Sequence, residues 1–470
     1  MVLPRFNQKQ KVYNSLKDKK IKIVWILVFL LVLAVGLPGS WWIWKRMEST
    51  PPVVAIDLQS PAIGAEKTLH LQVRDPQSGL KHVWVGIFSN GKESTLLEKK
   101  FSTAGFLKAG LTKSADFDIN IQAKALGLKD GAATLRLVAV DHSWQQWGKG
   151  NRTYLEKEVV IDTQPPRIEV LSKAHNINPG GAGLVLYKLS EPCRKSGVMV
   201  GDTFYSGYEW TVKDSRIMLA FFALSHLQGS NTKIHLAAAD NAGNSSRAGF
   251  YYHIRNRHFK QDTIRISDRF LAAKLPEFRD EIEDHEASQI DQFLYINRIL
   301  RDKNQKELQA LTAHSDATQY WDGAFLRLPK SANRAGFADH RNYRYQNRNI
   351  DDEFHLGVDL ASTANSPVPA ANKGKVVFAG RIGIYGNIIL IDHGFGLFSM
   401  YGHLSRMDVE PGQMVDKGSI IGKTGATGLA GGDHLHFAMM VHQTFVNPVE
   451  WWDASWIKNN ITDKLASIGG

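Results

Sequence analysis

Cysteine is almost absent from this sequence, which has one, Cys193, in 470 residues. A single cysteine cannot form an intrachain disulfide, so the domains must be stable through their own hydrophobic cores, even in an oxidising compartment. We expect Cys193 to be an inert core residue. The HExxH pattern, which places two histidines and a glutamate on one helix as a metal site, is also absent. No RNA- or DNA-binding pattern accompanies the net charge of +11, so nucleic acid is not expected as a partner.

Long apolar runs are equally scarce, and the clearest one lies near the N-terminus. Ile23–Leu37 is apolar almost throughout and continues into Trp41–Trp44, whose rings suit the aromatic belt at a membrane interface. We therefore predict a transmembrane helix over residues 23–45. The alternative is a cleaved signal peptide, for which Ala34-Val-Gly36 offers small residues. We favour retention of the helix because no clear A-x-A site follows the apolar run.

A basic arm, residues 1–22, precedes the predicted helix. Under the positive-inside rule this arm stays in the cytoplasm, so we expect a single pass through the cytoplasmic (inner) membrane, with the N-terminus inside. The bulk of the chain is then extracytoplasmic or periplasmic, where a basic surface favours anionic polymers or phospholipid. The basic residues, opposed only by Asp18, are Arg5, Lys9, Lys11, Lys17, Lys19, Lys20 and Lys22.

A chain of this length exceeds what one core usually organises, and we expect a multidomain protein of mainly β structure. Two β-rich segments each begin at a double proline, Pro51-Pro52 and Pro165-Pro166. Leu135–Asp141 in the first segment aligns with Ile234–Asp240 in the second, which indicates an internal repeat. The turn Asp240–Asn244 resembles those of bacterial Ig-like domains. The resemblance implies two Ig-like β-sandwiches, at residues 51–163 and 164–256, with spacing as their expected role and ligand binding as the alternative.

Two alternating stretches in the first segment predict a pair of strands. Leu69, Leu71 and Val73 alternate with polar residues, and Val83, Val85 and Ile87 do the same. Asp75–Gly79 divides the two stretches, so we predict that they pair antiparallel.

Periodicity changes to helical from about Ser267 to Thr312. We therefore predict a helical connector over residues 257–320. It is expected to pack against the C-terminal domain and position it; the alternative is that it holds that domain shut until a partner arrives.

Three short stretches near the C-terminus contain side chains suited to a hydrolytic zinc site. They are His355-Leu-Gly-Val-Asp359, Tyr401-Gly-His403 and His434-Leu-His436. Such a site needs three nitrogen or oxygen ligands and an open position for water. Side chains at i, i+2 and i+4 of a β-strand share one face, so each stretch could point its pair of side chains into a common groove. Flanking apolar runs predict strands at 374–379, 387–392 and 435–441.

In these stretches the sequence resembles the LytM/lysostaphin-type M23 zinc peptidases, also called the duplicated-hybrid-motif domain. The match runs from about Trp321 to Trp452 and includes further motifs in the family's order. We therefore place an antiparallel-β M23 peptidase domain at residues 321–455 and a C-terminal tail at 456–470. The further motifs are Tyr385-Gly-Asn387, Ile391-Asp-His-Gly394, Gly422-Lys-Thr-Gly425 and Asn447-Pro448.

The resemblance implies Zn²⁺ as cofactor, with His355, Asp359 and His436 as its ligands. It implies His403 and His434 as the two catalytic histidines that do not bind the metal. No other cofactor-binding residues are expected. One departure is Gly431-Gly432-Asp433, where many relatives have Ser-Thr-Gly-Pro. Because Asp433 should face away from His434, this departure bears on specificity at the rim rather than on zinc.

Other residues near the motifs have ordinary alternatives. Tyr401 is either a third oxyanion contact or a core residue. The polar run Arg341–Asn349 either lines the substrate groove or forms a solvated hairpin, and Asn347 or Asn349 could cap the open zinc position in a latent form. We expect His393 to be structural, and His314, His340 and His442 to have no role in catalysis.

The resemblance implies a membrane-anchored, extracytoplasmic zinc endopeptidase that hydrolyses stem peptides or cross-links of peptidoglycan. Some relatives have lost the ligands and activate cell-wall amidases, so a non-hydrolytic regulator with a cell-wall enzyme as partner is the first alternative. The complete ligand set favours the peptidase. A structural envelope protein that acts through its Ig-like modules is the second alternative.

Overall fold

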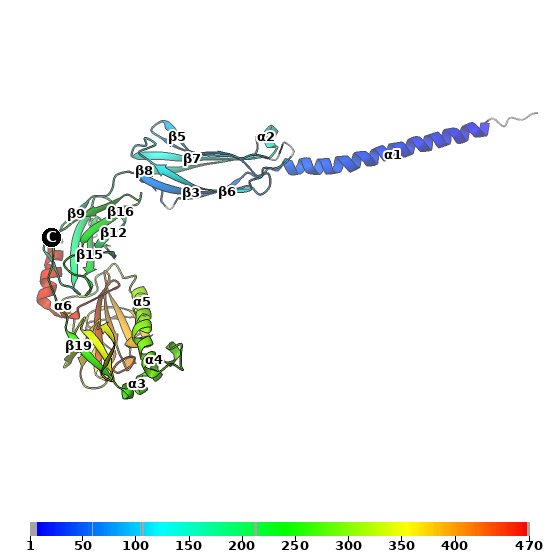
Figure 1. Ribbon diagram of the computed structural model, residues 1–470. Coiled ribbons are helices and arrows are strands. Elements are labelled where there is room, and N and C mark those ends of the chain that lie inside the picture. The colour runs from blue at the N-terminus through cyan, green and yellow to red at the C-terminus, as the bar shows by residue number, and fades with distance from the viewer. Residues whose placement is uncertain (1–6, 59, 104, 106–107, 211–213, 468–470) are drawn as a thin grey trace, which may run out of the picture. The chain divides into compact units, whose positions relative to one another are not determined.

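The computed structural model describes residues 7–58, 60–103, 105, 108–210 and 214–467, and it forms two compact units (Figure 1). Unit 1 holds Met1–Gln164 with Ala242–Asn244, and unit 2 holds Pro165–Asn241 with Ser245–Gly470. Residues 1–6 of the predicted basic arm, Arg5 among them, and residues 468–470 of the predicted tail lie outside the described residues.

The chain begins with a long helix, α1 (Asn7–Arg46). Its part Lys20–Arg46 is long and apolar enough to cross a membrane, and its apolar side chains are not buried in the protein, whereas Arg46 at its end is buried. The helix starts well before the predicted residue 23 and includes most of the predicted arm.

Unit 1 continues with two β-sheets, antiparallel except for the short parallel pair β2–β8, that share a core of buried aliphatic side chains. Alternation explains this core, because every second residue from Leu69 to Val73 and from Ala133 to Asp141 is buried. One sheet has the order β1 (Val53–Asp57), β3 (Glu66–Arg74), β6 (Ser114–Gln122). The other has the order β2 (Ala62–Ile63), β8 (Arg152–Ile161), β7 (Gly131–Asp141), β4 (Leu80–Ser89), β5 (Lys92–Lys100), with the short α2 (Gln145–Gly148) after β7.

The predicted pairing of the first two alternating stretches is wrong. Strand β3 pairs with β1 and β6, whereas β4 pairs with β5 and β7, so the two strands belong to different sheets. Their apolar faces meet across the core instead. Asp75 accepts hydrogen bonds from the backbone of Gln77 and Gly79, and the loop that it organises carries the chain from one sheet to the other.

Unit 2 opens with the second β-rich segment, which forms two four-stranded sheets and a two-stranded parallel pair. Strand β16 spans Ile234–Asp240, the range aligned above with the end of β7. The first sheet has the order β14 (Tyr208–Glu209), β15 (Ile217–Ala223), β11 (Ala182–Leu189), β9 (Ile168–Val170). The second has the order β13 (Thr203–Ser206), β12 (Cys193–Val200), β16, β17 (Ser245–Ala248), and the pair is β10 (His175–Ile177) with β18 (Tyr252–Ile254).

The C-terminal domain is built on one large antiparallel sheet that holds the predicted motifs. Its order is β20 (Ala332–Ala335), β23 (Val358–Ala361), β31 (Leu435–Val441), β27 (Leu397–Gly402), β26 (Gly386–Gly394), β25 (Gly374–Ile382), β29 (Met414–Val415), with β32 (Thr444–Val446) on β31. A small sheet has the order β24 (Pro367–Pro369), β30 (Ile420–Lys423), β28 (Arg406–Met407), and a 3₁₀ turn, Gly383–Tyr385, precedes β26.

Helices and a third sheet border this domain. Ser267 and Ser288 cap the first turns of α3 (Asp268–Lys274) and α4 (Gln289–Tyr295). Helix α3 continues into a 3₁₀ segment (Leu275–Glu281). Helix α4 continues into a π-turn (Ile296–Leu300) and then into α5 (Arg301–Leu311). The predicted connector is not wholly helical, because its first part forms a strand in the sheet β19 (Gln261–Ile266), β21 (His340–Tyr345), β22 (Arg348–Phe354).

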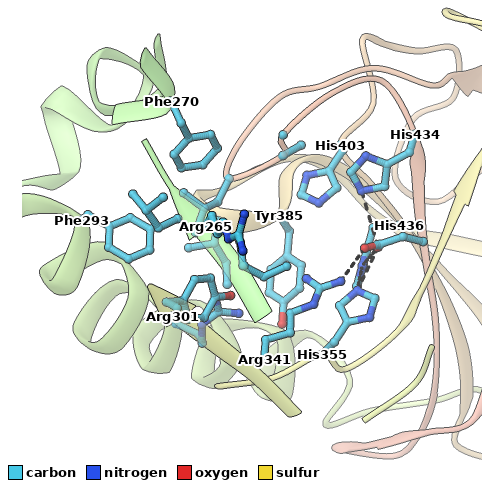
Figure 2. Close-up of a pocket in the computed structure, with 18 residues that line it drawn as sticks. Arg265, Phe270, Phe293, Arg301, Arg341, His355, Tyr385, His403, His434 and His436 are labelled. Atoms are coloured by element: carbon cyan, nitrogen blue, oxygen red, sulfur yellow. Dashed lines mark hydrogen bonds and ion pairs between the residues drawn. The ribbon is translucent and has the colours of Figure 1, made fainter. Parts of the chain in front are cut away.

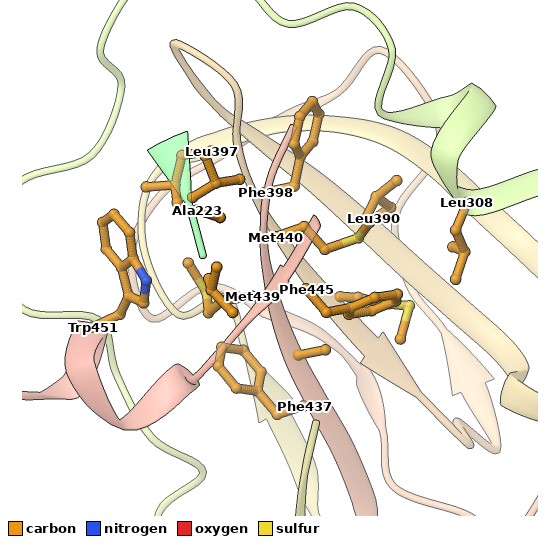
Figure 3. Close-up of a cluster of buried hydrophobic side chains, with 14 of the residues drawn as sticks. Ala223, Leu308, Leu390, Leu397, Phe398, Phe437, Met439, Met440, Phe445 and Trp451 are labelled. Carbon is orange, nitrogen blue, oxygen red and sulfur yellow. The ribbon is translucent and has the colours of Figure 1, made fainter. Parts of the chain in front are cut away.

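The second β-rich segment and the C-terminal domain share one hydrophobic core. Strand β15 lies against β31 and β32, and Figure 3 draws Ala223 of β15 with Leu397 and Trp451 of the C-terminal domain. The ring of Phe221 lies 6.1 Å from that of Trp451. The boundary that we predicted near residue 256 therefore does not separate two cores.

The segment predicted as a C-terminal tail is folded as far as Ser467. It forms α6 (Pro448–Trp452), α7 (Ala454–Ile457), a π-turn (Lys458–Thr462) and α8 (Asp463–Ala466). Ile457 and Ile461 are buried, and the Lys464 Nζ donates a hydrogen bond to the Leu184 carbonyl of β11. The end of the chain thus packs on the second β-rich segment.

Candidate metal and catalytic site

Three predicted ligands meet at the edge between β23 and β31. Asp359 and His436 are directly opposite each other on these antiparallel strands, so their side chains share a face. His355 comes from the link between β22 and β23, where its backbone N–H and carbonyl pair with Asp339 and Ala338. The expected single strand through His355 and Asp359 is therefore wrong, although both side chains reach the same point.

The donor atoms of this trio lie close together and are almost wholly buried. His355 Nε2 lies 2.9 Å from Asp359 Oδ1 and 3.1 Å from His436 Nδ1, and that nitrogen is 3.0 Å from Asp359 Oδ1 (Figure 2). Tetrahedral ligands held at zinc distances are separated by roughly 3.3 Å. The spacing and the His₂Asp donor set thus fit a zinc ion.

A hydrogen bond fixes the tautomer of the His355 imidazole. His355 Nδ1 donates to the Gly336 carbonyl, 2.9 Å away, so Nε2 presents its lone pair to the cluster. His436 Nε2 is buried without a partner, which leaves Nδ1 as the atom that faces Asp359. A cation at this point relieves the repulsion among the three acceptors.

Two neighbours restrict the trio. The Arg341 Nη2 donates to Asp359 Oδ2 at 2.8 Å, which leaves Oδ1 turned toward the histidines. Gly357 lies against His436, because a Cβ at this position would stand 2.5 Å from the imidazole. Arg341 is the first residue of the polar run Arg341–Asn349, and it lines the cavity.

The two histidines predicted as catalytic lie beside the trio. The His403 and His434 rings are 4.8 Å apart, and His434 Nε2 is 3.5 Å from Asp359 Oδ1. Each donates its Nδ1 hydrogen to a carbonyl, that of Thr427 or of Gly432, at 2.8 Å. The neutral His403 therefore carries a lone pair on Nε2, whereas His434 Nε2 faces the Asp359 carboxylate, which favours a proton on that nitrogen. His403 follows the end of β27 with φ of +60°, so its position does not come from strand alternation.

Burial and neighbouring charges together set the pKa values in this cluster. Burial lowers the pKa of His403 well below 6.5, with help from His434 and His436, and lowers the pKa of His436 to about 4. For Asp359, burial raises the pKa, but His355 and hydrogen bonds from the histidines bring it well below 3.8. For His434, burial lowers the pKa, and Asp359 raises it above 6.5. His403 is thus a neutral base at neutral pH.

A cavity of about 310 Å³ opens onto these residues. Its far wall comes from the N-terminal side of the domain, with Phe270 and Phe293 on helices and Arg265 on β19 (Figure 2). Tyr385 stands between this wall and the ligands, with its ring 5.6 Å from that of His436. Sequence patterns did not reveal Phe270, Phe293 or Arg265, because no short motif links them to residues some 60 to 170 positions later in the chain.

Tyr401 is not in this cavity, so the structure does not support the oxyanion contact. It is opposite Phe437 in the ladder, on the face away from His436, and it is buried in the core. Its hydroxyl accepts a hydrogen bond from the Ala371 N–H at 2.7 Å.

Asn347 and Asn349 lie at the tip of the β21–β22 hairpin and are exposed, away from the residues that line the cavity. The structure thus does not place either one as a cap on the ligands. Arg341, at the base of the same hairpin, lies next to the predicted ligands, because its guanidinium contacts Asp359.

The remaining residues mostly match their expected ordinary roles. His393 is buried and bridges the Lys373 carbonyl and the Ser399 hydroxyl. His340 pairs with Asp352 on the hairpin, and His314 is exposed. His442 stacks on Tyr208. Asp433 accepts hydrogen bonds from the Asn365 N–H and the Thr424 hydroxyl, and so fixes the rim loop.

A buried His₂Asp cluster beside two further histidines in one cavity has the donor set of a hydrolytic metal site. Residues 353–448 match the model described as Peptidase family M23, so this part of the chain is an M23 peptidase domain.

Relatives with this domain share only part of their length with the chain. The DD-carboxypeptidase/endopeptidase Mpg of Neisseria meningitidis serogroup B is 40% identical over 95 residues, which are 20% of this chain and 22% of that protein. The peptidoglycan DD-endopeptidase ShyA of Vibrio cholerae is 36% identical over 96 residues, 20% of this chain and 22% of that protein. The chain thus matches about a fifth of the length of these relatives. The solved catalytic domain of lysostaphin from Staphylococcus simulans is 30% identical, with 28% of this chain and 98% of that chain covered and a TM-score of 0.24.

Proposed function

We propose that this protein is a membrane-anchored, extracytoplasmic zinc endopeptidase that hydrolyses peptide bonds in peptidoglycan. The observation that carries the proposal is the convergence of His355 Nε2, Asp359 Oδ1 and His436 Nδ1 beside two more histidines in one cavity. The cell-wall substrate is supported by the relative ShyA, which is named as a peptidoglycan DD-endopeptidase, and by the match to Peptidase family M23.

His355, Asp359 and His436 would hold Zn²⁺. Zinc in such a site acidifies a water molecule and polarises a carbonyl. His403, neutral and with a free Nε2, can accept the proton of the attacking water. His434, with its higher pKa, can donate a hydrogen bond to the oxygen on which negative charge develops.

The cavity suits a short peptide. Its volume of about 310 Å³ is at the lower end of ligand sites, enough for one or two residues around the bond to be cut. The apolar side chains on its far wall exclude water, while Arg265, Arg301 and Arg341 offer positive charge to a substrate carboxylate. Stem peptides of peptidoglycan present both a backbone and free carboxylates to such a surface.

The segment Lys20–Arg46 supports the anchor, because its length and composition suit a membrane span. The lysine-rich sequence before it supports an orientation with the N-terminus in the cytoplasm. The peptidase domain would then face peptidoglycan in the extracytoplasmic space.

The test is digestion of purified peptidoglycan by the full chain in detergent. Reactions with chelator, with zinc restored, and with His436→Ala are compared by mass spectrometry, and His314→Ala serves as a surface-histidine control. We expect zinc-dependent release of cleaved peptides from wild type and His314→Ala only. Bound zinc without any released fragment would contradict the proposal and favour a regulator of a separate amidase.

A further inference from the structure

A second group of acidic residues lies in unit 1, where the chain leaves α1 and enters the β-sheets. Glu48 follows the end of the helix, Asp75 follows β3, and Asp141 ends β7. One carboxylate oxygen from each of the three lies within 4.8 Å of the others. Asp75 and Asp141 are 2% and 0% exposed, so water does not screen their charges well.

In both Asp75 and Glu48, one carboxylate oxygen accepts hydrogen bonds from the backbone, and the other oxygen has no hydrogen-bond donor. Asp75 Oδ1 accepts from the backbone of Gln77 and Gly79, and Glu48 Oε1 accepts from the Ser78 N–H at 3.0 Å. Asp75 Oδ2 and Glu48 Oε2 are buried and have no hydrogen-bond donor. A buried acceptor without a partner is costly, so these two oxygens require an explanation.

Ser78 supplies a separate sign of a missing ligand. Its side chain is 1% exposed, and its hydroxyl has no partner in hydrogen-bonding geometry. The hydroxyl is nevertheless close enough to Glu48 to lower the pKa of that carboxyl. The hydroxyl thus lies beside Glu48, one of the two acids with an unpartnered carboxylate oxygen.

The charges of the cluster do not balance. Arg46 is the cation beside it, and its Nη2 donates to the His142 carbonyl while its guanidinium lies over the Trp144 ring. Within the residues that the structure describes, Arg46 forms no ion pair with the three acids. Burial, and then the neighbouring carboxylates, raise the pKa of both Glu48 and Asp75. Three carboxylates against one guanidinium leave an excess of two negative charges, the charge of one divalent cation.

We propose that Glu48, Asp75 and Asp141, with the Ser78 hydroxyl, bind a calcium ion. All donors are oxygens, which Ca²⁺ prefers, whereas zinc prefers sites with nitrogen or sulfur. Ca²⁺ takes six to eight oxygens in flexible geometry, so water molecules complete a shell begun by loops of different origin. Bound Ca²⁺ ties the segment after α1 to the loops that follow β3 and β7.

The internal repeat places acids at corresponding positions of the second β-rich sequence. Glu48 stands three residues before Pro51-Pro52, and Asp162 stands three residues before Pro165-Pro166. Asp240 ends β16 as Asp141 ends β7. The acids therefore belong to the pattern of the repeat and are not incidental surface charges.

The test is calcium binding by the zinc-loaded full chain in detergent, after removal of calcium. Calorimetry and the thermal midpoint are followed as CaCl₂ is added, and Tb³⁺ luminescence excited through tryptophan provides a local probe, since Trp144 lies three residues after Asp141. Asp75→Asn retains the oxygen that accepts from Gln77 and Gly79 and replaces only the unpartnered one. Glu48→Gln does the same at the second acid, and exposed Glu66→Gln is the matched control.

We expect one saturable Ca²⁺ per chain, a higher thermal midpoint with Ca²⁺, and at least tenfold weaker binding in Asp75→Asn and in Glu48→Gln. Glu66→Gln should bind as wild type does. Circular dichroism shows whether each variant is folded, and the Glu48 variant decides the matter if the Asp75 variant is not. No saturable binding by wild type, or unchanged binding in both folded variants, overturns the site. Tighter binding of Mg²⁺ than of Ca²⁺ overturns the assignment to calcium.

Discussion

Gly357 shows how a single hydrogen atom can set the geometry of the site. A methyl group there would stand 2.5 Å from the His436 ring, well inside van der Waals contact. The ring belongs to a ligand opposite Asp359 in the ladder, so it has little room to turn away. We expect Gly357→Ala to displace His436 and to weaken zinc binding by about tenfold or more, as other changes around metal ligands do.

The measurement for Gly357→Ala is competition for zinc with a chromophoric chelator. Gly431→Ala is the matched control, because it lies on the rim of the same cavity and a Cβ there meets no atom within 4 Å. Equal zinc affinity in the two variants would show that His436 does not need the space at Gly357.

Arg341 is the residue on which the orientation of Asp359 depends. Its Nη2 holds Asp359 Oδ2 at 2.8 Å, and both side chains are largely buried. Arg341→Ala should leave the carboxylate free to rotate, and we expect a loss of about 10- to 100-fold in zinc affinity. Arg341→Lys should recover only part of it, because an ammonium lacks the planar fork of a guanidinium. Arg344→Ala, on the exposed side of the same hairpin, is the control, and zinc titration of the three variants separates positioning from net charge.

At the scale of elements, α3 and the 3₁₀ segment that follows it restrain the loop that forms one rim of the cavity. Glu277 Oε2 accepts from the Gly428 N–H at 2.8 Å, and Lys274 donates to the Ala426 carbonyl. Lys274 and Glu277 also pair with each other at 2.7 Å. The helical segment therefore fixes the backbone next to Leu429 and Gly431, which line the site.

Glu277→Gln tests this restraint. The amide cannot both accept from Gly428 and face the Lys274 ammonium without bringing two donors together, so the loop should open more often. A loss of about 1 kcal/mol corresponds to roughly fivefold faster amide exchange at Gly428. Hydrogen exchange with mass spectrometry measures it, with exposed Glu286→Gln as control. Unchanged exchange in Glu277→Gln would show that the loop is held by its own contacts.

Short-range patterns identified residues that the structure brings together, because most of them lie on or next to regular strands. The strand 435–441 matches β31, and alternation along it places His436 on the cavity face. The same reasoning failed for His403, which follows a strand in a left-handed conformation, and for Tyr401, which points into the core. The two-residue spacing between Tyr401 and His403 does not show that the strand ends between them, at Gly402.

Long-range pairing was less readable. Strands β3 and β4 alternate alike and are neighbours in sequence, but alternation says which face is buried and not which strand lies alongside. The wall of the cavity and the shared core depend on ordinary apolar residues such as Phe293 and Phe221. Nothing in the sequence around such residues indicates which distant residue each of them contacts.

At the scale of the whole molecule, Lys464 links stability to pH. Its ammonium is buried beside β11, and burial lowers its pKa from 10.5 to about 8. Between these values the unfolded chain binds one proton more than the folded chain, so stability rises with pH. From pH 7.5 to 9.5 the gain is at most about 2 kcal/mol. Denaturant unfolding at both pH values should show this gain in wild type and lose it in Lys464→Met; an equal gain in the variant would assign it to other groups.

The shared core of unit 2 makes the second β-rich segment part of the folded peptidase. Buried Glu450 of α6 accepts from the Asn178 side chain at 2.9 Å and the Ala182 N–H at 3.1 Å, both in that segment. Phe221 packs against Trp451 on the same side. A chain that begins at residue 257 would lack Phe221 and would expose the Trp451 ring, a loss of packing on the order of 1–5 kcal/mol.

We therefore expect residues 257–470 to be insoluble or to unfold at a much lower temperature than residues 165–470, although both contain the whole zinc site. Thermal unfolding and zinc binding of the two fragments provide the measurement. Phe221→Ala in the longer fragment is the intermediate case, since it removes one contact and keeps the segment. Equal thermal midpoints for the two fragments would mean that the segment is a spacer after all, and that the peptidase domain folds on the large sheet and its bordering helices alone.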